Sequence, residues 1–391
     1  MRFTHPEHPG RCVRLAYCLN VHAAETLEDL HAGLRTITLP LRDRLVTPGE
    51  SFGVGMYFSA ALAEELQRSE AALGDLRQLL AREALDPFTY NAFPYGGFHA
   101  ASVKHKVYHP PWGSDERLAY TLLVAELGCA LAGAGRRLSI STHAGGWGAE
   151  LAHGDRAERA LEGLEDARDF LHALAARGGG QIALGIEAEP RSNANATADA
   201  AAIARRAGVS LCLDACHSAV EFEDPRAALD AALGAGPLAK FQYTNALALL
   251  APGKNAAGWR ALLALDEPRY LHQVTARSAD GLRRFDDLGP LKEHDAAQFD
   301  ELRCHFHVPV DREELGSGLV TTRAHAEALL DGLLEAPGRW GSDELHVEIE
   351  TYTWDVLPGA ARGPGSLVEG LEREYRHVIG RLEAKGWTRG G

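Results

Sequence analysis

The sequence predicts an α/β protein in which eight parallel strands, each followed by helical sequence, close into a (β/α)8 or TIM barrel. Short runs rich in apolar and β-branched residues alternate along the chain with longer amphipathic stretches rich in alanine and leucine. Eight such runs are present, which is the number that closes this barrel. Several of them end in side chains suited to metal binding, and in such a barrel the C-terminal strand ends meet at one mouth.

The elements follow one another in the order that this fold requires. The predicted strands lie at 15–21, 52–59, 88–93, 138–142, 182–187, 209–214, 239–244 and 345–350. The main helical stretches, in which apolar residues recur every three to four positions, lie at 60–85, 115–132, 156–177, 197–207 and 226–233. Gly133, the run 178–180 and Gly208 each fall between a helical stretch and a strand, where glycine is favoured as a helix C-cap.

The alternation is interrupted between Thr244 and Leu345. Two further strand-like runs, 270–276 (YLHQVTA) and 302–310 (LRCHFHVPV), occur there. We predict a single barrel domain over residues 1–391 with an insertion at approximately 246–310 that lies over the mouth. Alternatively, one of these runs is a barrel strand and the run 239–244 is displaced.

Composition narrows the function classes. The 391 residues include 46% hydrophobic and 24% charged residues, as in ordinary globular domains. The net charge of −14 disfavours binding to nucleic acid or anionic lipid, so a small-molecule partner is expected. No run approaches the roughly 20 apolar residues of a membrane span and no secretory signal is evident, which predicts a cytoplasmic protein. The six cysteines form no Cys-x-x-Cys pair and are interpreted as reduced, mostly core thiols.

Carboxylates at three strand ends are candidate metal ligands. Glu187 and Glu189 lie two residues apart in IALGIEAEP and therefore share a face. Buried carboxylates need a compensating cation, which favours Glu187 as a ligand, whereas Glu189 either joins it or turns into the loop towards Arg191. Asp214 ends another strand and capping of the next helix is the alternative role. Glu350 ends LHVEIE, whose alternation also fits a half-exposed strand.

Histidines provide the remaining candidates. His217 follows Asp214 in Asp-Ala-Cys-His, and His305 and His307 share a face of one run, a spacing that recurs in zinc sites. His143 ends LSISTH and is a further ligand candidate, although a lone buried histidine is usually a core residue. Weaker candidates, better suited to binding substrate, are His99, Gln242 and His272. Glycine-rich segments match no nucleotide-binding spacing.

The order of histidine, glutamate, Asp-x-x-His and a late glutamate on successive strand ends resembles the xylose isomerase-like barrel superfamily. That superfamily includes sugar and inositol isomerases and epimerases as well as endonuclease IV-type phosphodiesterases. The resemblance implies that Glu187, Asp214 and Glu350 bind one divalent ion together with a histidine on the seventh strand. KFQYTN has Gln242 there, which leaves His272 or His305 to supply the imidazole.

Longer motifs resemble a narrower family, metabolite-traffic protein E of the bacterial ebo gene cluster. The resemblance runs from about Leu15 to Trp354 and rests on FTYNAFPYGGFH, VKHKVYHPPW, LDACHSAVEFEDP, KFQYTNAL, YLHQV, CHFHVP and VEIETYTW. It implies the same barrel and a link to metabolite movement, and it does not specify a reaction.

Three functions fit these observations. The first is a metal-dependent isomerase or epimerase of a sugar- or cyclitol-like metabolite, with zinc or manganese as the expected ion and Glu187 and Glu350 transferring the proton. The second is a multi-zinc phosphoester hydrolase that also uses His217, His305 and His307. The third is a barrel without catalytic activity that binds a metabolite, since fold alone does not establish catalysis.

Overall fold

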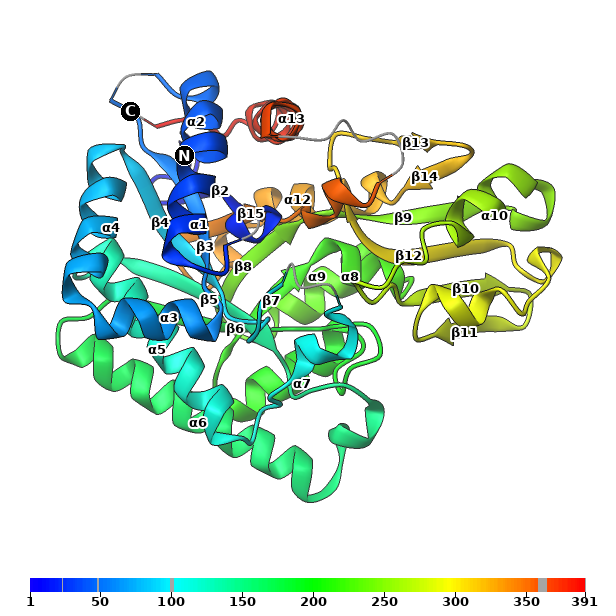
Figure 1. Ribbon diagram of the computed structural model, residues 1–391, viewed down its shortest axis with the longest axis horizontal. Coiled ribbons are helices and arrows are strands. Elements are labelled where there is room, and N and C mark those ends of the chain that lie inside the picture. The colour runs from blue at the N-terminus through cyan, green and yellow to red at the C-terminus, as the bar shows by residue number, and fades with distance from the viewer. Residues whose placement is uncertain (23, 48, 99–101, 358–363, 391) are drawn as a thin grey trace.

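Eight parallel strands form the closed barrel that the sequence predicts (Figure 1). In the computed structural model, β2 to β8 pair in chain order and β15 closes the barrel by pairing with both β8 and β2. The barrel strands are β2 (Cys12–Cys18), β3 (Phe52–Tyr57), β4 (Leu85–Asn91), β5 (Arg137–His143), β6 (Gln181–Glu187), β7 (Ser210–Asp214), β8 (Leu238–Tyr243) and β15 (Glu344–Ile349). The predicted fold class is confirmed. The alternative that placed a later run in the barrel is wrong, because β8 is the seventh strand.

The structure describes residues 1–22, 24–47, 49–98, 102–357 and 364–390. Within this part, helices surround the barrel and pack against its outer face (Figure 1). They are α1 (Leu27–Gly33), α2 (Leu39–Leu45), α3 (Ala60–Arg68), α4 (Glu70–Arg82), α5 (Asp115–Ala132), α6 (Gly154–Ala176), α7 (Thr197–Ala207), α8 (Ala215–Val220), α9 (Pro225–Leu233), α12 (Arg323–Glu335) and α13 (Pro364–Ala384). No helix of this part is long and apolar enough to cross a membrane.

Local sequence explains where these elements begin and end. Ser59, Ser114 and Asp224 each accept a hydrogen bond from a backbone N–H in the first turn of the helix that follows. Gly208 ends α7 with a φ of 67°, a left-handed conformation that glycine adopts without a steric penalty. All residues of β2 and β3 are buried, as expected for parallel strands covered on both sides.

The first barrel strand, β2, has two short strands added beside it and ends three residues earlier than the sequence predicts. Two short strands extend the sheet from this strand: β1 (Arg2–Thr4) pairs with β2 and β16 (Thr388–Arg389) pairs with β1, both antiparallel. The first barrel strand was predicted at 15–21 but ends at Cys18, and Leu19–Val21 form a 3-10 turn. That turn places the side chain of Asn20 at the mouth of the barrel.

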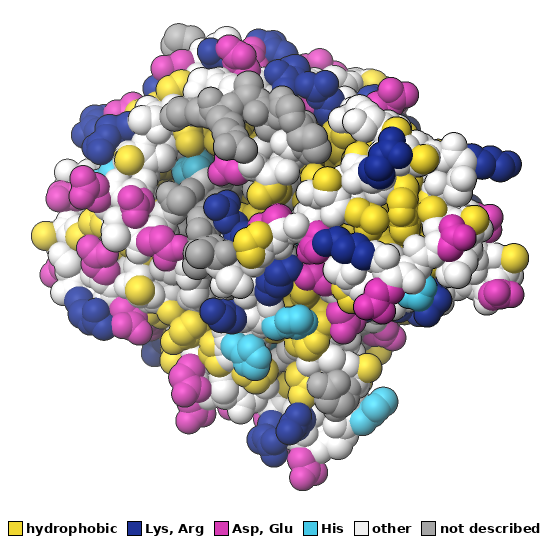
Figure 2. All heavy atoms as spheres, turned by 45° about the vertical axis from the view of Figure 1, so that its right-hand side comes forward, with side chains coloured by type: hydrophobic (Ala, Val, Ile, Leu, Met, Phe, Trp, Pro, Cys, Tyr) yellow, Lys and Arg dark blue, Asp and Glu magenta, His cyan; other side chains and the backbone are white. Residues whose placement is uncertain are grey.

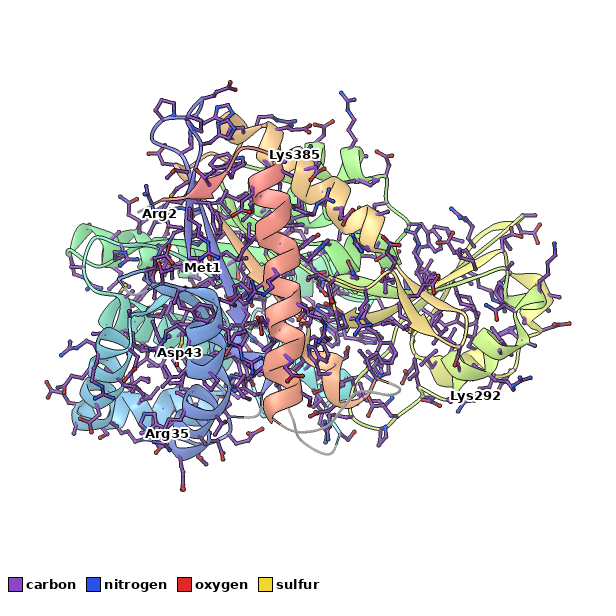
Figure 3. The ribbon with its side chains drawn as sticks, turned by 90° about the horizontal axis from the view of Figure 1, so that it is seen from above. Met1, Arg2, Arg35, Asp43, Lys292 and Lys385 are labelled. Carbon is purple, nitrogen blue, oxygen red and sulfur yellow. The ribbon has the colours of Figure 1, made fainter. Side chains whose placement is uncertain are left out.

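A second sheet follows β8 directly and has its own hydrophobic core. It is antiparallel, has the order β11-β10-β12-β9-β14-β13, and projects from one side of the barrel (Figure 1). Its strands are β9 (Asn245–Leu250), β10 (Val274–Ser278), β11 (Gly281–Phe285), β12 (Glu301–Val308), β13 (Glu314–Gly316) and β14 (Leu319–Thr321), and it carries α10 (Ala256–Leu263) and α11 (Leu288–Leu291). We call this segment, 245–321, the inserted sheet. Figure 3 shows its residue Lys292 at the opposite end of the molecule from Met1 and Arg2.

The described charged side chains are spread over the surface and do not form a patch of one sign on the face shown in Figure 2. On the face that includes the inserted sheet, acidic and basic side chains are interspersed (Figure 2). Among the described residues, the large hydrophobic side chains that are exposed are Leu250 and Leu282, both on the inserted sheet.

Candidate metal centre

A cavity at the C-terminal end of the barrel collects most of the predicted ligands. Barrel residues and the near end of the inserted sheet line it together. Its polar lining residues include Glu187, Glu189, His217, His305, His307 and Glu350. The inserted sheet therefore contributes directly to the candidate site, while its far end projects away from the barrel.

The period of two along β12 explains how this strand serves both a core and a site. Leu302, Cys304 and Phe306 belong to the core of the inserted sheet. His305 and His307 point the opposite way and line the cavity. Pairing between β12 and β9 is irregular between Cys304 and Val308, which is where the two histidines lie. Such irregularities commonly redirect side chains beside active sites.

Three imidazole nitrogens converge at one point. The Nε2 atom of His305 lies 2.9 Å from Nε2 of His307 and 3.2 Å from Nε2 of His217. The Nε2 atoms of His217 and His307 are also 3.2 Å apart. Nitrogen ligands about 2.0–2.1 Å from a tetrahedral zinc ion are separated by roughly 3.3 Å, so the observed spacing is close to that of a bound set. We call these three residues the histidine trio.

The other nitrogen of each ring is fixed by a carbonyl acceptor. Nδ1 of His217 lies 2.8 Å from the carbonyl oxygen of Ala188, and Nδ1 of His307 lies 3.0 Å from that of Glu350. Nδ1 of His305 lies 2.7 Å from Oε1 of Gln273. Each Nδ1 therefore carries the proton and donates it, which leaves the three Nε2 lone pairs facing one another. Lone pairs in this arrangement repel, and a bound cation would convert the repulsion into ligation.

Burial and charge repulsion keep His305 and His307 in the form that binds a metal. Burial, and then the neighbouring His217, hold the pKa of His305 and of His307 well below the usual value. Neutral imidazole is the form that ligates metals, so no proton has to be displaced near neutral pH.

Glu189 supplies a carboxylate to the same point. Its Oε2 lies 3.3 Å from Nε2 of His217, and it forms a potential ligating group with His217 and His305. Its Oε1 accepts hydrogen bonds from the hydroxyl of Tyr108 at 2.8 Å and from Nε2 of Gln273 at 3.0 Å. Burial raises the pKa of Glu189 to about 7, although His217 opposes the rise. The carboxylate thus faces the trio and does not turn towards Arg191.

Arg191 instead fastens the loop after β6 to the inserted sheet. Its guanidinium binds Glu221 at 2.8 Å and the hydroxyl of Thr275 on β10 at 2.6 Å, and its φ of 69° places it in the left-handed region. Glu221 also accepts a hydrogen bond from Arg284 on β11 at 2.8 Å. This network fixes the barrel loop carrying Glu189 relative to β10 and β11, and β10 pairs with β12, the strand that carries both histidines.

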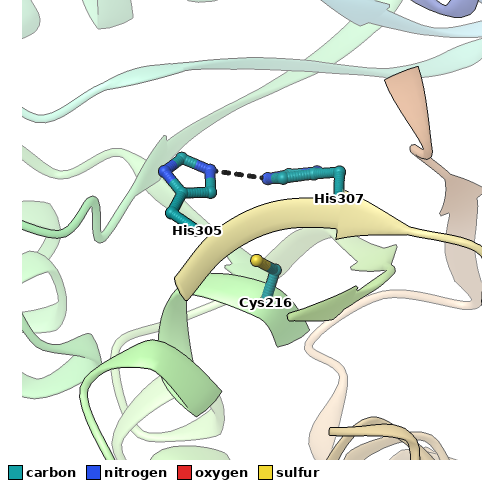
Figure 4. A group of neighbouring side chains, drawn as sticks. All are labelled: Cys216, His305 and His307. Atoms are coloured by element: carbon teal, nitrogen blue, oxygen red, sulfur yellow. Dashed lines mark hydrogen bonds between the residues drawn. The ribbon is translucent and has the colours of Figure 1, made fainter. Parts of the chain in front are cut away.

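Two further residues could complete a ligating group with members of the trio. Asp214 forms one with His217 and His307, and Cys216 forms one with His305 and His307. In Figure 4 the side chain of Cys216 lies below β12 and the two imidazoles lie above it. The Cys216 thiol contacts the carbonyl oxygen of Phe306 at 3.7 Å, and burial raises its pKa well above the usual value. A buried thiol held in this form is a poor ligand, so the carboxylates are the better partners of the trio.

The barrel carboxylates form a separate group deeper in the mouth. Burial, and then repulsion from Asp214, raise the pKa of Glu187 to about 8, while burial raises that of Asp214 to about 7. Burial, and then repulsion from Glu187, raise the pKa of Glu350 well above its usual value. Oε1 of Glu350 accepts hydrogen bonds from Asn20 at 2.7 Å and from Asn91 at 2.8 Å. Glu187 and Asp214 therefore take up protons near neutral pH.

A lysine at the floor of the barrel compensates this group. Nζ of Lys240 donates to Oε2 of Glu348 at 2.6 Å, and both side chains are 0% exposed. Burial opposes the lysine's charge, but attraction to Glu348 keeps the pKa of Lys240 above its usual value. Lys240 also favours the ionised forms of Glu187, Asp214 and Glu350. A fixed ammonium thus supplies part of the positive charge that these acids need.

Replacing Lys240 by methionine is expected to destabilise the protein strongly. The change leaves the Glu348 carboxylate buried without its partner, which typically costs about 3 kcal/mol or more. The double variant Lys240→Met with Glu348→Met should recover at least half of the loss, because both buried charges are then removed. Urea unfolding in the presence of a chelator measures both effects without interference from metal binding. A Lys240→Met protein as stable as wild type would show that the pair is not needed.

The remaining predicted residues lie apart from the trio. His143 is fully buried, and burial, and then Arg117, lower its pKa well below the usual value. Oε1 of Gln242 accepts a hydrogen bond from the thiol of Cys212 at 3.1 Å. His272 stacks on Phe306 with ring centroids 3.6 Å apart and is paired with Glu267. His99 lies outside the described residues.

The ligand set implied by the superfamily does not converge in this structure. Among the described residues, the groups of three or more potential ligands are all built on members of the trio, and none contains Glu187 or Glu350. Of the three carboxylates in the implied set, Asp214 alone joins such a group, and His305, one of the two candidates for the missing imidazole, joins others. The donor atoms thus lie close enough for a metal at the trio, whereas Glu187 and Glu350 join no such group among the described residues, and metal binding by Glu187, Asp214 and Glu350 stays a prediction.

Several residues of the site were not predicted from the sequence. They are Asn20, Asn91, Tyr108, Lys240, Gln273 and Tyr352. Lys240 had a usable signal, because it lies two residues before Gln242 and therefore faces the barrel interior as Gln242 does. Gln273 and Tyr108 had none, because their roles depend on how the inserted sheet meets the barrel.

Comparisons with known proteins agree on the fold. No protein-family model matches the chain, and no curated protein matches it. The IolI protein, solved with a bound zinc atom, is 14% identical with a TM-score of 0.50, covering 95% of this chain and 99% of its own. D-psicose 3-epimerase, solved in the presence of D-fructose, is 12% identical with a TM-score of 0.51, covering 94% and 99%. A xylose isomerase domain protein from Planctomyces limnophilus is 12% identical with a TM-score of 0.49, covering 95% and 97%. The chain thus shares the TIM-barrel fold of the IolI protein and D-psicose 3-epimerase.

Proposed function

We propose that this protein is a divalent-metal-dependent isomerase or epimerase that acts on a sugar- or cyclitol-like metabolite. The observation that carries the proposal is that one cavity contains both the histidine trio and two buried carboxyls, Glu187 and Glu350, whose pKa values are raised. A metal centre and a pair of acid–base groups are the two components that proton transfer next to a carbonyl requires.

The metal would be held by the trio with Glu189. Three imidazoles and one carboxylate suit zinc, manganese or iron, and we propose zinc or manganese. When bound, the ion supplies a Lewis acid that stabilises negative charge developing on a substrate oxygen. Gln273 and Tyr108 hold Glu189 in place through hydrogen bonds to its Oε1. Loss of either should therefore weaken binding of the ion.

Glu187 and Glu350 would transfer the proton. One carboxylate removes a proton from the carbon beside the carbonyl, and the other carboxyl returns a proton to the neighbouring carbon or to the opposite face of the same carbon. Asn20 and Asn91 orient Glu350 by donating to its Oε1, which leaves Oε2 available. Burial raises the pKa of Glu187 to about 8, which is close to the operating pH, where acid–base catalysis is most efficient, and it raises the pKa of Glu350 in the same direction.

We also propose that the chain is a member of the metabolite-traffic protein E family of the ebo cluster. The motifs FTYNAFPYGGFH, YLHQV and CHFHVP support this, since they contribute residues to the cavity described above. The names of the structures with the same fold are compatible with the chemistry, because IolI was solved with zinc and D-psicose 3-epimerase in the presence of a ketose.

Proton exchange with solvent tests the proposal. Protein loaded with one equivalent of zinc or manganese is incubated in D2O with D-fructose, D-psicose and 2-keto-myo-inositol, and loss of the carbon-bound proton signal is followed by NMR. We expect deuterium incorporation at a carbon beside the carbonyl of at least one compound. The same protein treated with a chelator should show none. Absence of exchange in every case, with metal bound, would contradict the isomerase and favour a metabolite-binding barrel.

A multi-zinc phosphoester hydrolase is the second candidate. The observation that favours it is the overlap of two groups that share His217: Glu189 with His217 and His305, and Asp214 with His217 and His307. Two ions per chain in metal analysis, with release of phosphate from a phosphomonoester, would support it. One ion per chain would support the first proposal.

A further inference from the structure

The outer half of the cavity is built from apolar and aromatic side chains. The ring centroid of Phe98 lies 4.7 Å from that of Tyr352 and 5.3 Å from that of Tyr270. Tyr270 and Tyr352 are 5.2 Å apart, and Tyr352 in turn lies 4.6 Å from the ring of His307. These three aromatic residues therefore form a continuous wall that begins at the trio and leads outward. We call Phe98, Tyr270 and Tyr352 the aromatic wall.

Other segments extend this wall with carbon-rich side chains. They are Phe93, Pro94, Val103, Val107 and Leu271. Tyr270 and Leu271 belong to the inserted sheet's segment, whereas the others come from the loops after β4 and β15. Apolar side chains from both the barrel loops and the inserted sheet therefore line the cavity between the metal centre and the solvent.

Several polar groups of the cavity form hydrogen bonds with one another. Asn20 and Asn91 donate to Glu350, and Gln273 and Tyr108 donate to Glu189. The ammonium of Lys104, at the outer part, binds Asp287 at 2.5 Å. The hydroxyl of Tyr352 lies 3.5 Å from Nε2 of His305, so the polar end of this ring also faces the metal centre. Hydroxyl groups placed along the aromatic wall would lose water and meet mainly carbon, which costs free energy.

We propose that the substrate is amphiphilic: an oxygen-bearing head binds at the trio, and an apolar substituent, aromatic or branched hydrocarbon, packs on the aromatic wall. This inference rests on the proposed metal-dependent function and narrows its substrate class. In such a substrate, the sugar-like hydroxyl and carbonyl groups are confined to the head. A substituent of this kind gains free energy in proportion to the apolar area that it buries, and rings gain further from offset or edge-to-face contacts.

Hydroxamates with matched heads and different tails test the inference. The hydroxamate group chelates zinc through two oxygens, so acetohydroxamate, benzohydroxamate and D-gluconohydroxamate differ only in what they place on the wall. Affinities for the zinc-loaded protein are measured by calorimetry and divided by each compound's affinity for free zinc. Burial of a phenyl ring should give benzohydroxamate roughly tenfold or greater preference over each of the other two.

Two variants test whether the preference for benzohydroxamate arises at the aromatic wall. Phe98→Ala should reduce the preference for benzohydroxamate by roughly fivefold, because it removes one ring of the wall. Phe170→Ala, which removes a half-buried ring on α6 outside the cavity, should leave it unchanged. Circular dichroism checks that both variants fold, and the wild-type preference tests the inference even when a variant does not.

The outcomes separate this inference from the function on which it rests. Equal corrected affinities of the three hydroxamates, or tighter binding of the gluconohydroxamate, would overturn the amphiphilic substrate while leaving the metal centre intact. Failure of all three to bind, in a protein that retains no zinc, would overturn the metal centre and the inference with it. A preference for benzohydroxamate in a protein that shows no proton exchange would support the wall and contradict the isomerase.

Discussion

Replacing His307 by glutamine is expected to abolish metal binding and, with it, turnover. His307 contributes one of three converging Nε2 atoms, and its ring is oriented by donation from Nδ1 to the carbonyl oxygen of Glu350. Glutamine has a similar length but lacks the imidazole lone pair in that direction. Loss of a supporting contact alone typically costs 10–100-fold in metal affinity, so loss of a ligand should cost roughly 100-fold or more. Plasma mass spectrometry after gel filtration measures retained metal, and calorimetry measures affinity.

A histidine outside the cavity provides the matched control. His377 on α13 is half-buried and its Nε2 lies 3.3 Å from the hydroxyl of Tyr243. His377→Gln should retain about one ion per chain. Full metal occupancy in His307→Gln would contradict the trio as the metal centre. Loss of metal in both variants would point to a general effect on folding.

The barrel was predictable because its signals are local. Each barrel strand is a short apolar run set apart by helical sequence, and burial on both faces selects such runs in parallel sheets. The run NALALL (Asn245–Leu250) was not predicted to be a strand. It follows β8 immediately and becomes β9 of a different sheet, although it would fit the barrel strand's pattern equally well. Only its pairing with β12 and β14 distinguishes it, and pairing partners are not encoded locally.

The candidate site likewise has features that local sequence predicts and features that depend on tertiary packing. A shared face for His305 and His307 follows from the period of two and was predicted. Their meeting with His217 depends on how the inserted sheet packs against the barrel, and on an irregular pairing beside the two histidines. Glu189 illustrates the limit most clearly. Its direction depends on a loop in which Arg191 has a positive φ and binds Glu221, so its spacing from Glu187 left two orientations open.

Lys240 explains why carboxylates at strand ends were an incomplete guide to the metal. The superfamily resemblance implied that Glu187, Asp214 and Glu350 share one divalent ion. Buried carboxylates need positive charge nearby, and a buried ammonium supplies part of it. In this structure Lys240 lies below these acids and binds Glu348 directly. The sequence argument from buried carboxylates thus did not consider a cation supplied by the chain itself, and whether these acids also bind a metal stays a prediction.

Replacing Glu187 by glutamine is expected to remove catalysis while leaving the metal in place. The side chain faces the cavity beside the trio, yet it belongs to none of the ligating groups among the described residues. Glutamine keeps its shape and removes the group that accepts or returns the proton. Acid–base groups contribute about 10²–10⁴-fold to rate, so exchange of the substrate proton should slow by roughly 10³-fold. Metal content and exchange rate are measured on the same sample.

A buried carboxyl outside the cavity distinguishes this effect from a general loss of structure. Glu374 on α13 is fully buried, burial raises its pKa to about 8, and it accepts hydrogen bonds from the N–H of Val310 and the hydroxyl of Thr351. Glu374→Gln should therefore retain both metal and exchange activity. Loss of metal from Glu187→Gln alone would make Glu187 a ligand, as the superfamily resemblance implies, and would move the metal from the trio into the barrel. Retained metal with undiminished exchange would assign the proton transfer to another group, with Glu350 as the next to test.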